Sequence, residues 1–324
     1  MGRPATVIYG SDAARVFYEG DRFGRERAMP TSVLHLLQDE GSVQTLAGAE
    51  HRHRKSLFIA LLMEGETLVQ LRKIFSEEFF AAVGEGRDSL VLYEELTRVL
   101  TRTALRWAGM SPEGVDVDAL AGQLASMIEN AGRFGPPNWA ARARRLRTEA
   151  WAMAAISKAR SHGGGMVGEI AAHSDRDGAR LSDADAGVEL INVLRPTVAV
   201  GRFIVFAALA LHRHPHWRER VAQGSAGDLQ NFVDEVRRFY PFFPVVGGRA
   251  HRRFDWQGRD FFPGDWVLLD LYATNHDERI WSEPNRFRPE RFEGWSGDRN
   301  SLVPQGAGYI SDGHPGIPPG LHSA

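Results

Sequence analysis

The stretch ELINVLRPTVAVGRFIVFAALAL, from Glu189 to Leu211, is the most apolar part of the chain, and the architecture follows from it. Near its middle, Arg195 and Pro196 stand side by side. An interior proline removes a backbone hydrogen bond, costs a helix about 3 kcal/mol, and bends it where carbonyl groups lose their partners. We therefore expect a long central helix over Ala186–Arg213 that is kinked near its proline.

A transmembrane helix is the first alternative for this stretch, because about 20 apolar residues can span a bilayer. Four residues interrupt the apolar run: Asn192, Arg195, Pro196 and Arg202. An arginine at the middle of a membrane costs roughly 2.5–3.5 kcal/mol even on a lenient insertion scale. The sequence therefore favours a buried core helix and no membrane span.

Arg195 is the residue whose placement matters most for function. Apolar residues surround it on every helical face, which predicts that its side chain points inward. A buried guanidinium cannot lose its proton, so it needs a carboxylate, a phosphate or several carbonyl groups. Its planar fork suits a carboxylate, and in an apolar pocket that anion would be the head of an oily acid. The alternative is a surface helix on which Arg195 pairs with a neighbouring Asp or Glu.

The composition is that of a globular protein, with 43% hydrophobic and 25% charged residues in a chain of 324. A net charge of -2 gives no reason to expect nucleic acid as a partner. The sequence has no cysteine, which excludes disulfides, thiolate metal sites and cysteine nucleophiles. The N-terminus lacks the order of segments typical of a signal peptide, so we expect a cytoplasmic protein. Without a repeat or a sharp boundary, a single domain over residues 1–324 is expected.

The rest of the chain reads as mostly helical, with short strand-like pieces near both ends. Glu50–Leu62 has helical spacing, whereas Ala5–Gly10 is a compact apolar run that ends at glycine. Beyond residue 244, short β-like pieces alternate with Gly and Pro turns. These patterns predict a mainly α fold with a small β portion. The Gly/Pro-rich tail is turn-forming, and we expect the chain to stop inside a loop.

Two further groups of charged residues are candidate sites. Glu235 and Arg238 share a helix face at i, i+3, although such a pair is usually solvated and worth under about 1 kcal/mol. His51 and Lys55 lie one helical turn apart and could hold an anion; the alternative is a basic surface. His51 and His53 diverge on a helix, so we expect no metal site there. The sequence shows no phosphate loop, nucleophile elbow or paired-histidine zinc motif.

Taken together, the motifs resemble a known family. In chain order they are RVFYEGDRFGRERAMP, HRHRK, RFGPPNW, ELINVLRPTVAV, EVRRFYPFFP, LLDLYATNHDERIWSEPNRFRPERF and VPQGAG. With them the chain resembles the cytochrome P-450 superfamily over nearly its whole length, and within it the bacterial fatty-acid peroxygenases. The Glu-x-x-Arg pair with the later FRPERF is typical of the superfamily. LRPTVAV, found where most members carry an acid-threonine pair, is typical of the peroxygenase branch.

The resemblance implies a P-450-like fold and a heme-dependent oxidoreductase of the monooxygenase type. Such an enzyme hydroxylates fatty acids at the α or β carbon with hydrogen peroxide and needs no redox partner. It implies that Arg195 binds the fatty-acid carboxylate above the heme iron, with Pro196 beside it. The bound carboxylate would then act as the acid-base group that helps to break the O–O bond. Gln44 matches an active-site position that is glutamine in hydroxylating members and histidine in strongly decarboxylating ones.

The resemblance also assigns residues around the heme. Three match residues that hold the heme propionates: Arg25, His51 and Lys55. Three others match a structural network behind the heme: Glu235, Arg238 and Arg291. These six are therefore expected to position the cofactor or to support the fold, and not to act on the substrate.

The sequence departs from the family at the heme ligand. The family carries Gly-His-Arg-Cys-Pro-Gly, in which the cysteine thiolate is the axial iron ligand. Counting forward from Pro304, that position falls on Gly316, and aligning Pro315-Gly316 with the family's Pro-Gly leaves no Arg or Cys after His314. We therefore predict no protein ligand for the iron, and a P-450-like domain that is incomplete at both ends. The alternatives to an active peroxygenase are an inactive relative that keeps an apolar acid-binding pocket, and a fragment that does not fold stably.

Overall fold

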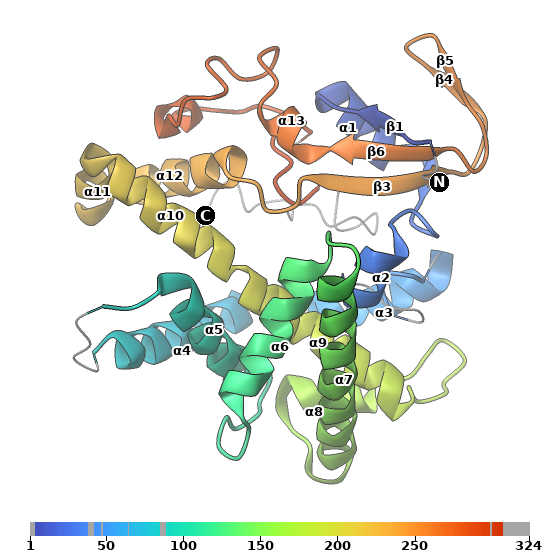
Figure 1. The fold of residues 1–324 in the computed structure, drawn as a ribbon, viewed down its shortest axis with the longest axis vertical. Coiled ribbons are helices and arrows are strands. Elements are labelled where there is room, and N and C mark those ends of the chain that lie inside the picture. The colour runs from blue at the N-terminus through green and yellow to red at the C-terminus, as the bar shows by residue number, and fades with distance from the viewer. Residues whose placement is uncertain are drawn as a thin grey trace. The chain divides into compact units, whose positions relative to one another are not determined.

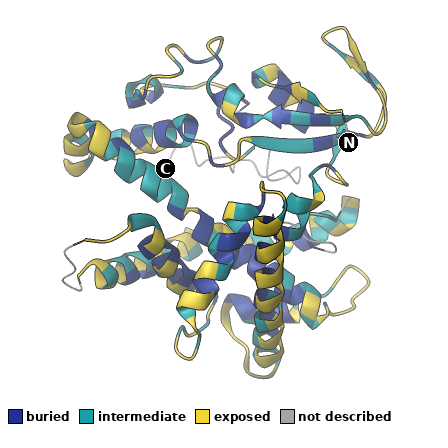
Figure 2. Cartoon of the chain, viewed as in Figure 1, coloured by how far each residue is buried: buried dark blue, intermediate teal, exposed yellow. Residues whose placement is uncertain are grey.

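The computed structural model describes residues 4–37, 42–46, 48–63, 65–84, 89–298 and 300–306. The chain forms two compact units (Figure 1). One comprises Pro30–Gly201, and the other combines Met1–Met29 with Arg202–Ala324. Each unit has its own buried residues (Figure 2). The expectation of a single domain over residues 1–324 stays a prediction.

The unit Pro30–Gly201 is helical. Its helices are α2 (Thr31–Leu37), α3 (Gly48–Leu62), α4 (Gly65–Val83), α5 (Leu92–Trp107), α6 (Val117–Asn130), α7 (Pro136–His162), α8 (Gly165–Ala172) and α9 (Asp183–Ala199). Helix α9 packs against α5, α6, α7 and α8, and most of its residues are buried. It is therefore the central helix of this unit, as its apolar sequence predicts.

The long helix expected over Ala186–Arg213 is present as two segments. Helix α9 ends at Ala199, and α10 (Gly201–Arg213) begins after the turn residue Val200. Pro196 lies inside α9 and has no N–H to donate to the preceding turn, while glycine at the start of α10 favours helix weakly. By length and composition alone, the span Asp183–Arg213 could cross a membrane. The buried charged and polar residues of α9 instead fit the core helix that the sequence predicts.

The other unit contains the sheets. Its helices are α1 (Ser11–Tyr18), all but the first residue of α10, α11 (Pro215–Ala222), α12 (Ala226–Phe239), α13 (Leu271–Asn275) and the 3-10 helix η1 (Pro289–Phe292). Four strands form one sheet in the order β1 (Thr6–Ile8), β6 (Trp266–Asp270), β3 (Val245–Ala250) and β2 (Phe23–Gly24). β1 pairs with β6 in parallel, and the other pairs are antiparallel. β4 (Phe254–Trp256) and β5 (Arg259–Phe261) form a separate hairpin.

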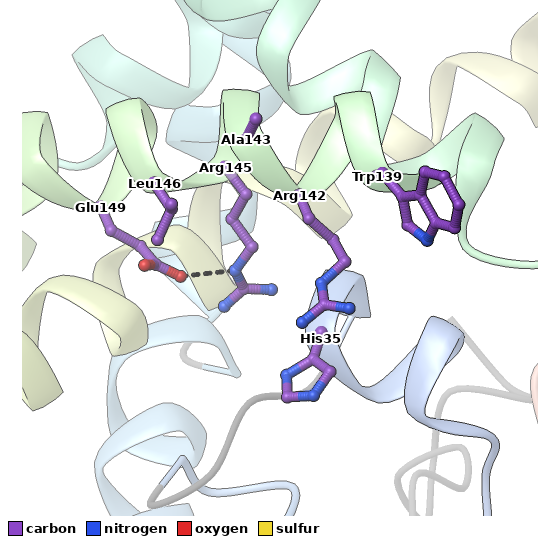
Figure 3. A pocket seen from close by; sticks show the side chains of 7 residues that line it. All are labelled: His35, Trp139, Arg142, Ala143, Arg145, Leu146 and Glu149. Carbon is purple, nitrogen blue, oxygen red and sulfur yellow. Dashed lines mark hydrogen bonds and ion pairs between the residues drawn. The ribbon is translucent and has the colours of Figure 1, made fainter. Parts of the chain in front are cut away.

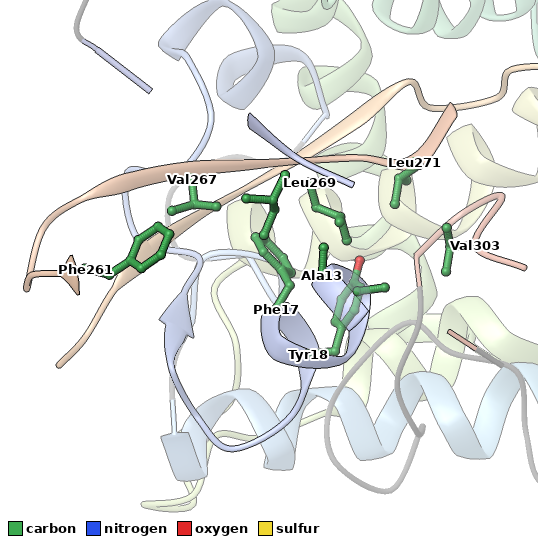
Figure 4. Packing of buried hydrophobic residues seen from close by; sticks show 10 residues of the cluster. Ala13, Phe17, Tyr18, Phe261, Val267, Leu269, Leu271 and Val303 are labelled. Atoms are coloured by element: carbon green, nitrogen blue, oxygen red, sulfur yellow. The ribbon is translucent and has the colours of Figure 1, made fainter. Parts of the chain in front are cut away.

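The sheet packs on α1 through an aromatic and aliphatic core (Figure 4). Phe17 of α1 stacks on Phe23 with ring centroids 5.0 Å apart. Val267 and Leu269 are two positions apart on β6, so both side chains point to the same face of the strand. Gly248 of β3 leaves room for the Phe17 ring, because a Cβ there would lie 2.9 Å from two of its ring carbons. The observed fold is mainly α with a small β portion, so the predicted fold class is confirmed.

Candidate acid-binding site and buried ion network

Arg195 lies inside the helical unit and not on its surface. Its residue is 5% exposed, and its guanidinium donates to the carbonyl oxygens of Leu36 (3.2 Å) and Leu37 (2.6 Å), at the end of α2. It also donates to Oδ1 of Asn192, one turn earlier in α9, at 3.1 Å. The several carbonyl groups that a buried arginine requires are thus present. Pro196, which follows it, is exposed.

Asn192 links Arg195 to Gln44. Its Nδ2 donates to Oε1 of Gln44 at 3.0 Å and to Oε2 of Glu189 at 2.8 Å. The hydroxyl of Ser42 also donates to Oε1 of Gln44, at 2.8 Å. The structure therefore brings together the two residues expected at the acid-binding site, Arg195 and Gln44, through one amide side chain.

Glu189 extends this hydrogen-bond network beyond Asn192. Its side chain is fully buried and accepts from the backbone N–H of Val43 and from Nη1 of Arg54, each at 2.9 Å. Burial raises the pKa of the Glu189 carboxyl, against the hydrogen bonds from Asn192 and Arg54 that favour its charged form. Burial opposes the charge of Arg54, but its bonds to Asp175 and Glu189 raise its pKa overall. The result is a polar network inside an otherwise apolar unit.

Sequence reasoning did not single out Glu189, Asn192 and Arg54 as parts of a site. The signal that could have found the first two is their spacing, because Glu189, Asn192 and Arg195 are successive i, i+3 neighbours in α9. Arg54 carries no such signal. It is buried between Glu189 and Asp175, which lie 135 and 121 residues further along the chain.

The three candidate propionate ligands lie in different parts of the chain. His51 and Lys55 are half-buried on α3, one turn apart, as the helical spacing predicts. Arg25 is exposed and belongs to the other unit. Nε2 of His53, also on α3, is 2.9 Å from the carbonyl oxygen of Ser174, and its ring stacks on His173.

Glu235, Arg238 and Arg291 form a buried ion network in the sheet-containing unit. Nε and Nη2 of Arg238 donate to the two carboxylate oxygens of Glu235 at 2.7 and 2.9 Å. Both side chains are fully buried, so this is not the solvated pair that such spacing usually indicates. Nε of Arg291 lies 3.1 Å from Oε2 of Glu235, and burial lowers the pKa of Arg291 against the attraction of Glu235. Arg238 also donates to the carbonyl oxygens of Asn275 and Pro284.

The chain contains residues that could bind the propionate groups of the expected heme, but no residue of the kind expected to bind its iron. Arg25, His51 and Lys55 carry side-chain N–H groups that can donate to propionates. The sequence contains no cysteine, and the described residues hold no group of three His, Cys, Asp or Glu suited to a metal ion. Gly316 and His314, where the axial ligand position was expected, lie outside the described residues. The donor set therefore lacks the thiolate that a P-450 iron requires.

Comparison with known proteins defines the class. A cytochrome P450 family model matches residues 229–309, which include the Glu235 network. The chain is similar to cytochrome P450SP alpha (CYP152B1) in complex with (R)-ibuprophen, at 40% identity and a TM-score of 0.89, covering 95% of this chain and 77% of that one. It is also similar to cytochrome P450EX alpha (CYP152N1) with myristic acid, at 36% identity and a TM-score of 0.87, covering 93% of this chain and 74% of that one.

These similarities place the chain among the cytochromes P450 by its fold and by sequence identity over nearly the whole chain. A third solved structure, a single-residue variant of cytochrome P450 OleT in complex with arachidonic acid, is 33% identical with a TM-score of 0.89, covering 95% of this chain and 74% of that one. The chain belongs to the CYP152 family, the fatty-acid peroxygenase branch of the cytochromes P450.

Curated relatives match over shorter stretches. Rhazimal synthase from Alstonia scholaris is 28% identical over 186 residues, which is 49% of this chain and 37% of that protein. Flavonoid-6-hydroxylase from Ocimum basilicum is 34% identical over 110 residues, which is 30% of this chain and 20% of that protein. The chain thus matches well under two thirds of each of these relatives.

Proposed function

We propose that this chain is the acid-binding part of a heme-dependent peroxygenase that hydroxylates long-chain fatty acids at the α or β carbon with hydrogen peroxide. The observation that carries the proposal is Arg195, buried in an apolar helix, where its guanidinium donates to the carbonyl oxygens of Leu36 and Leu37 and to Oδ1 of Asn192. A carboxylate is a stronger acceptor than a neutral carbonyl, so an incoming fatty-acid head would replace such a partner. Relatives solved with myristic acid and arachidonic acid support this substrate class.

In this proposal the polar network orients the guanidinium. Asn192 fixes the rotation of Arg195 and the amide of Gln44, while the buried Glu189 fixes Asn192. Holding the fatty acid by its head restricts reaction to the carbons next to the carboxylate. Heme, when bound, would supply the oxidising chemistry. Hydrogen peroxide is the two-electron oxidant, with one oxygen atom going to the hydroxyl group and the other to water, so no redox partner is needed. We expect the protein in the cytoplasm.

A second function, acid binding without oxidation, is favoured by one observation: the sequence has no cysteine. Imidazole or carboxylate ligands donate less electron density to iron than a thiolate and favour O–O cleavage less. For this chain we therefore expect weak, non-stoichiometric heme uptake and no thiolate-type band in the reduced carbon-monoxide difference spectrum. A full thiolate-type band would contradict this second function and support peroxygenase activity.

Calorimetric titration with sodium dodecanoate tests the role of Arg195. Arg195→Ala should weaken binding at this site at least about tenfold, because a charge-assisted hydrogen bond is lost. Arg147→Ala, which removes an exposed arginine from α7, is the matched control and should bind like the parent. Dodecanol should bind weakly to the parent. If Arg195→Ala keeps the same number of dodecanoate sites with the same affinities as the parent while its far-ultraviolet circular dichroism is unchanged, the proposed anchoring is wrong.

A further inference from the structure

A pocket of about 380 Å³ lies between α2 and α7, within the helical unit (Figure 3). One side is formed by His35 of α2. The other side is one face of α7, because Trp139, Arg142, Ala143 and Leu146 follow the i, i+3, i+4, i+7 spacing of a helix face. Arg145 and Glu149 complete the lining. Neither the acid-binding network nor the Glu235 network uses these residues.

The charges of this pocket leave one cation to bind a ligand. Arg145 is almost fully buried, and its Nε donates to Oε1 of Glu149 at 2.6 Å, so these two charges balance each other. Arg142 is exposed and makes no ion pair with another residue in the described part of the chain. Figure 3 shows its guanidinium directed across the gap toward the ring of His35. The pocket therefore presents one guanidinium in excess.

The walls of the pocket are apolar on both sides of Arg142. Trp139 is 64% exposed and Leu146 is 66% exposed, which is unusual for side chains of this size. A simple inorganic anion would leave both in water. An anion with an apolar body would cover them while its head meets Arg142. A single guanidinium in excess balances one negative charge, which points to a head with a single negative charge.

We propose that the pocket between α2 and α7 is a second binding site for an amphiphilic monocarboxylate, separate from the site at Arg195. Arg142 binds the carboxylate as a fork, His35 borders it from α2, and Trp139 and Leu146 contact the apolar body. Helix α2 links the two sites, because Leu36 and Leu37, next to His35, provide carbonyl oxygens to Arg195. The pocket itself stands on its own lining and does not rest on the proposed function.

Dodecanoate titrations of the full chain in an Arg195→Ala background isolate this second site. We expect this variant to keep one binding event, and Arg195→Ala/Arg142→Ala to weaken it at least about tenfold. The matched control is Arg195→Ala/Arg147→Ala, since Arg147 is exposed on the same helix but does not line the pocket. Equal affinities of the two double variants would overturn the proposal. Quenching of tryptophan fluorescence by 12-bromododecanoate should decrease in Arg195→Ala/Trp139→Leu, and unchanged quenching would also overturn it.

Head-group and tail variants test the ligand class. In the Arg195→Ala background, dodecanol and acetate should each bind at least about tenfold more weakly than dodecanoate, because one lacks the charge and the other the apolar body. Tighter binding of dodecyl phosphate than of dodecanoate would overturn the assignment to a monocarboxylate. The two sites are also distinguishable in failure. Loss of all binding in Arg195→Ala alone would refute this pocket and leave the proposed function standing, whereas loss in Arg142→Ala but not in Arg195→Ala would do the reverse.

Discussion

Two buried arginines in this chain are held in different ways. Arg238 in the sheet-containing unit donates both arms of its fork to the carboxylate of Glu235, and backbone carbonyls take a third N–H group. Arg195 in the helical unit donates to backbone carbonyls and to the amide oxygen of Asn192. The carboxylate of Glu235 balances the charge of Arg238 and locks its side chain, whereas the carbonyl and amide oxygens that accept from Arg195 can give way to a stronger, charged acceptor. The first arrangement is suited to structural support and the second to binding an acid.

The largest effect is expected from removing the acid of the first network. Glu235→Ala leaves the buried charges of Arg238 and Arg291 without their carboxylate, and breaking a buried pair from one side costs about 3–5 kcal/mol. Urea unfolding, followed by far-ultraviolet circular dichroism, should show the sheet-containing unit destabilised by this amount or unfolded. If Glu235→Ala lowered the free energy of unfolding by less than about 1 kcal/mol, the value for exposed pairs, the structural role given to the Glu235–Arg238 pair would be contradicted.

The matched control is an acid at the surface of the same unit. Glu283 pairs with Arg286 and Arg288, and its side chain is half exposed. Glu283→Ala should therefore change the free energy of unfolding by less than about 1 kcal/mol. A loss as large as that of Glu235→Ala would show that burial is not what separates the two pairs.

An intermediate effect is expected from the amide that orients Arg195. Asn192→Ala removes hydrogen bonds to Arg195, Gln44 and Glu189 without removing the cation. Neutral hydrogen bonds of this kind are worth about 0.5–1.5 kcal/mol, so dodecanoate affinity should fall about 2- to 10-fold. Calorimetric titration of Asn192→Ala with dodecanoate, with Arg195→Ala titrated in parallel, provides the measurement. An Asn192→Ala chain that binds as tightly as the parent would mean that the carbonyl groups of α2 alone position the guanidinium.

The smallest effect is a pH dependence near the Glu189–Arg54 pair. Burial lowers the pKa of His173 from its usual 6.5, and the nearby His53 and Arg54 lower it further against Asp175. The unfolded chain therefore takes up a proton more readily than the folded one, and stability should fall as the pH drops through about 6.5. Replacing the ring, as in His173→Gln, should flatten the unfolding free energy between about pH 7.5 and about pH 5.5. Parallel curves for His173→Gln and the parent would contradict this account.

Much of this arrangement could be predicted from local spacing. The apolar residues around Arg195 predicted that it lies inside, and the i, i+3 spacing of Glu235 and Arg238 predicted that they share a face. The kink at Pro196 was expected, although the helix is in fact interrupted at Val200. These predictions succeed because the geometry of a helix fixes the relations between residues that are three or four positions apart.

Other features could not be read from spacing. The sequence suggested a solvated Glu235–Arg238 pair if it stood alone, whereas the folded chain buries it and places Asn275, Pro284 and Arg291 in contact with it. The pocket between α2 and α7 was not predicted either. Its two sides come from His35 and from residues about a hundred positions later in the chain. Neither helix has a sequence motif that would predict its contact with the other.

By itself, the sequence determined the helix that runs through the helical unit, the inward direction of Arg195, the mainly α class and the family. Tertiary structure alone decided which oxygens hold Arg195, that Arg54 pairs with Glu189, and that Arg142 and His35 line one pocket. The physical reason is the range of the interactions. Periodicity and propensity act within a few residues, whereas the partners of Arg54 and Arg195 are chosen by packing and desolvation between segments more than a hundred positions apart.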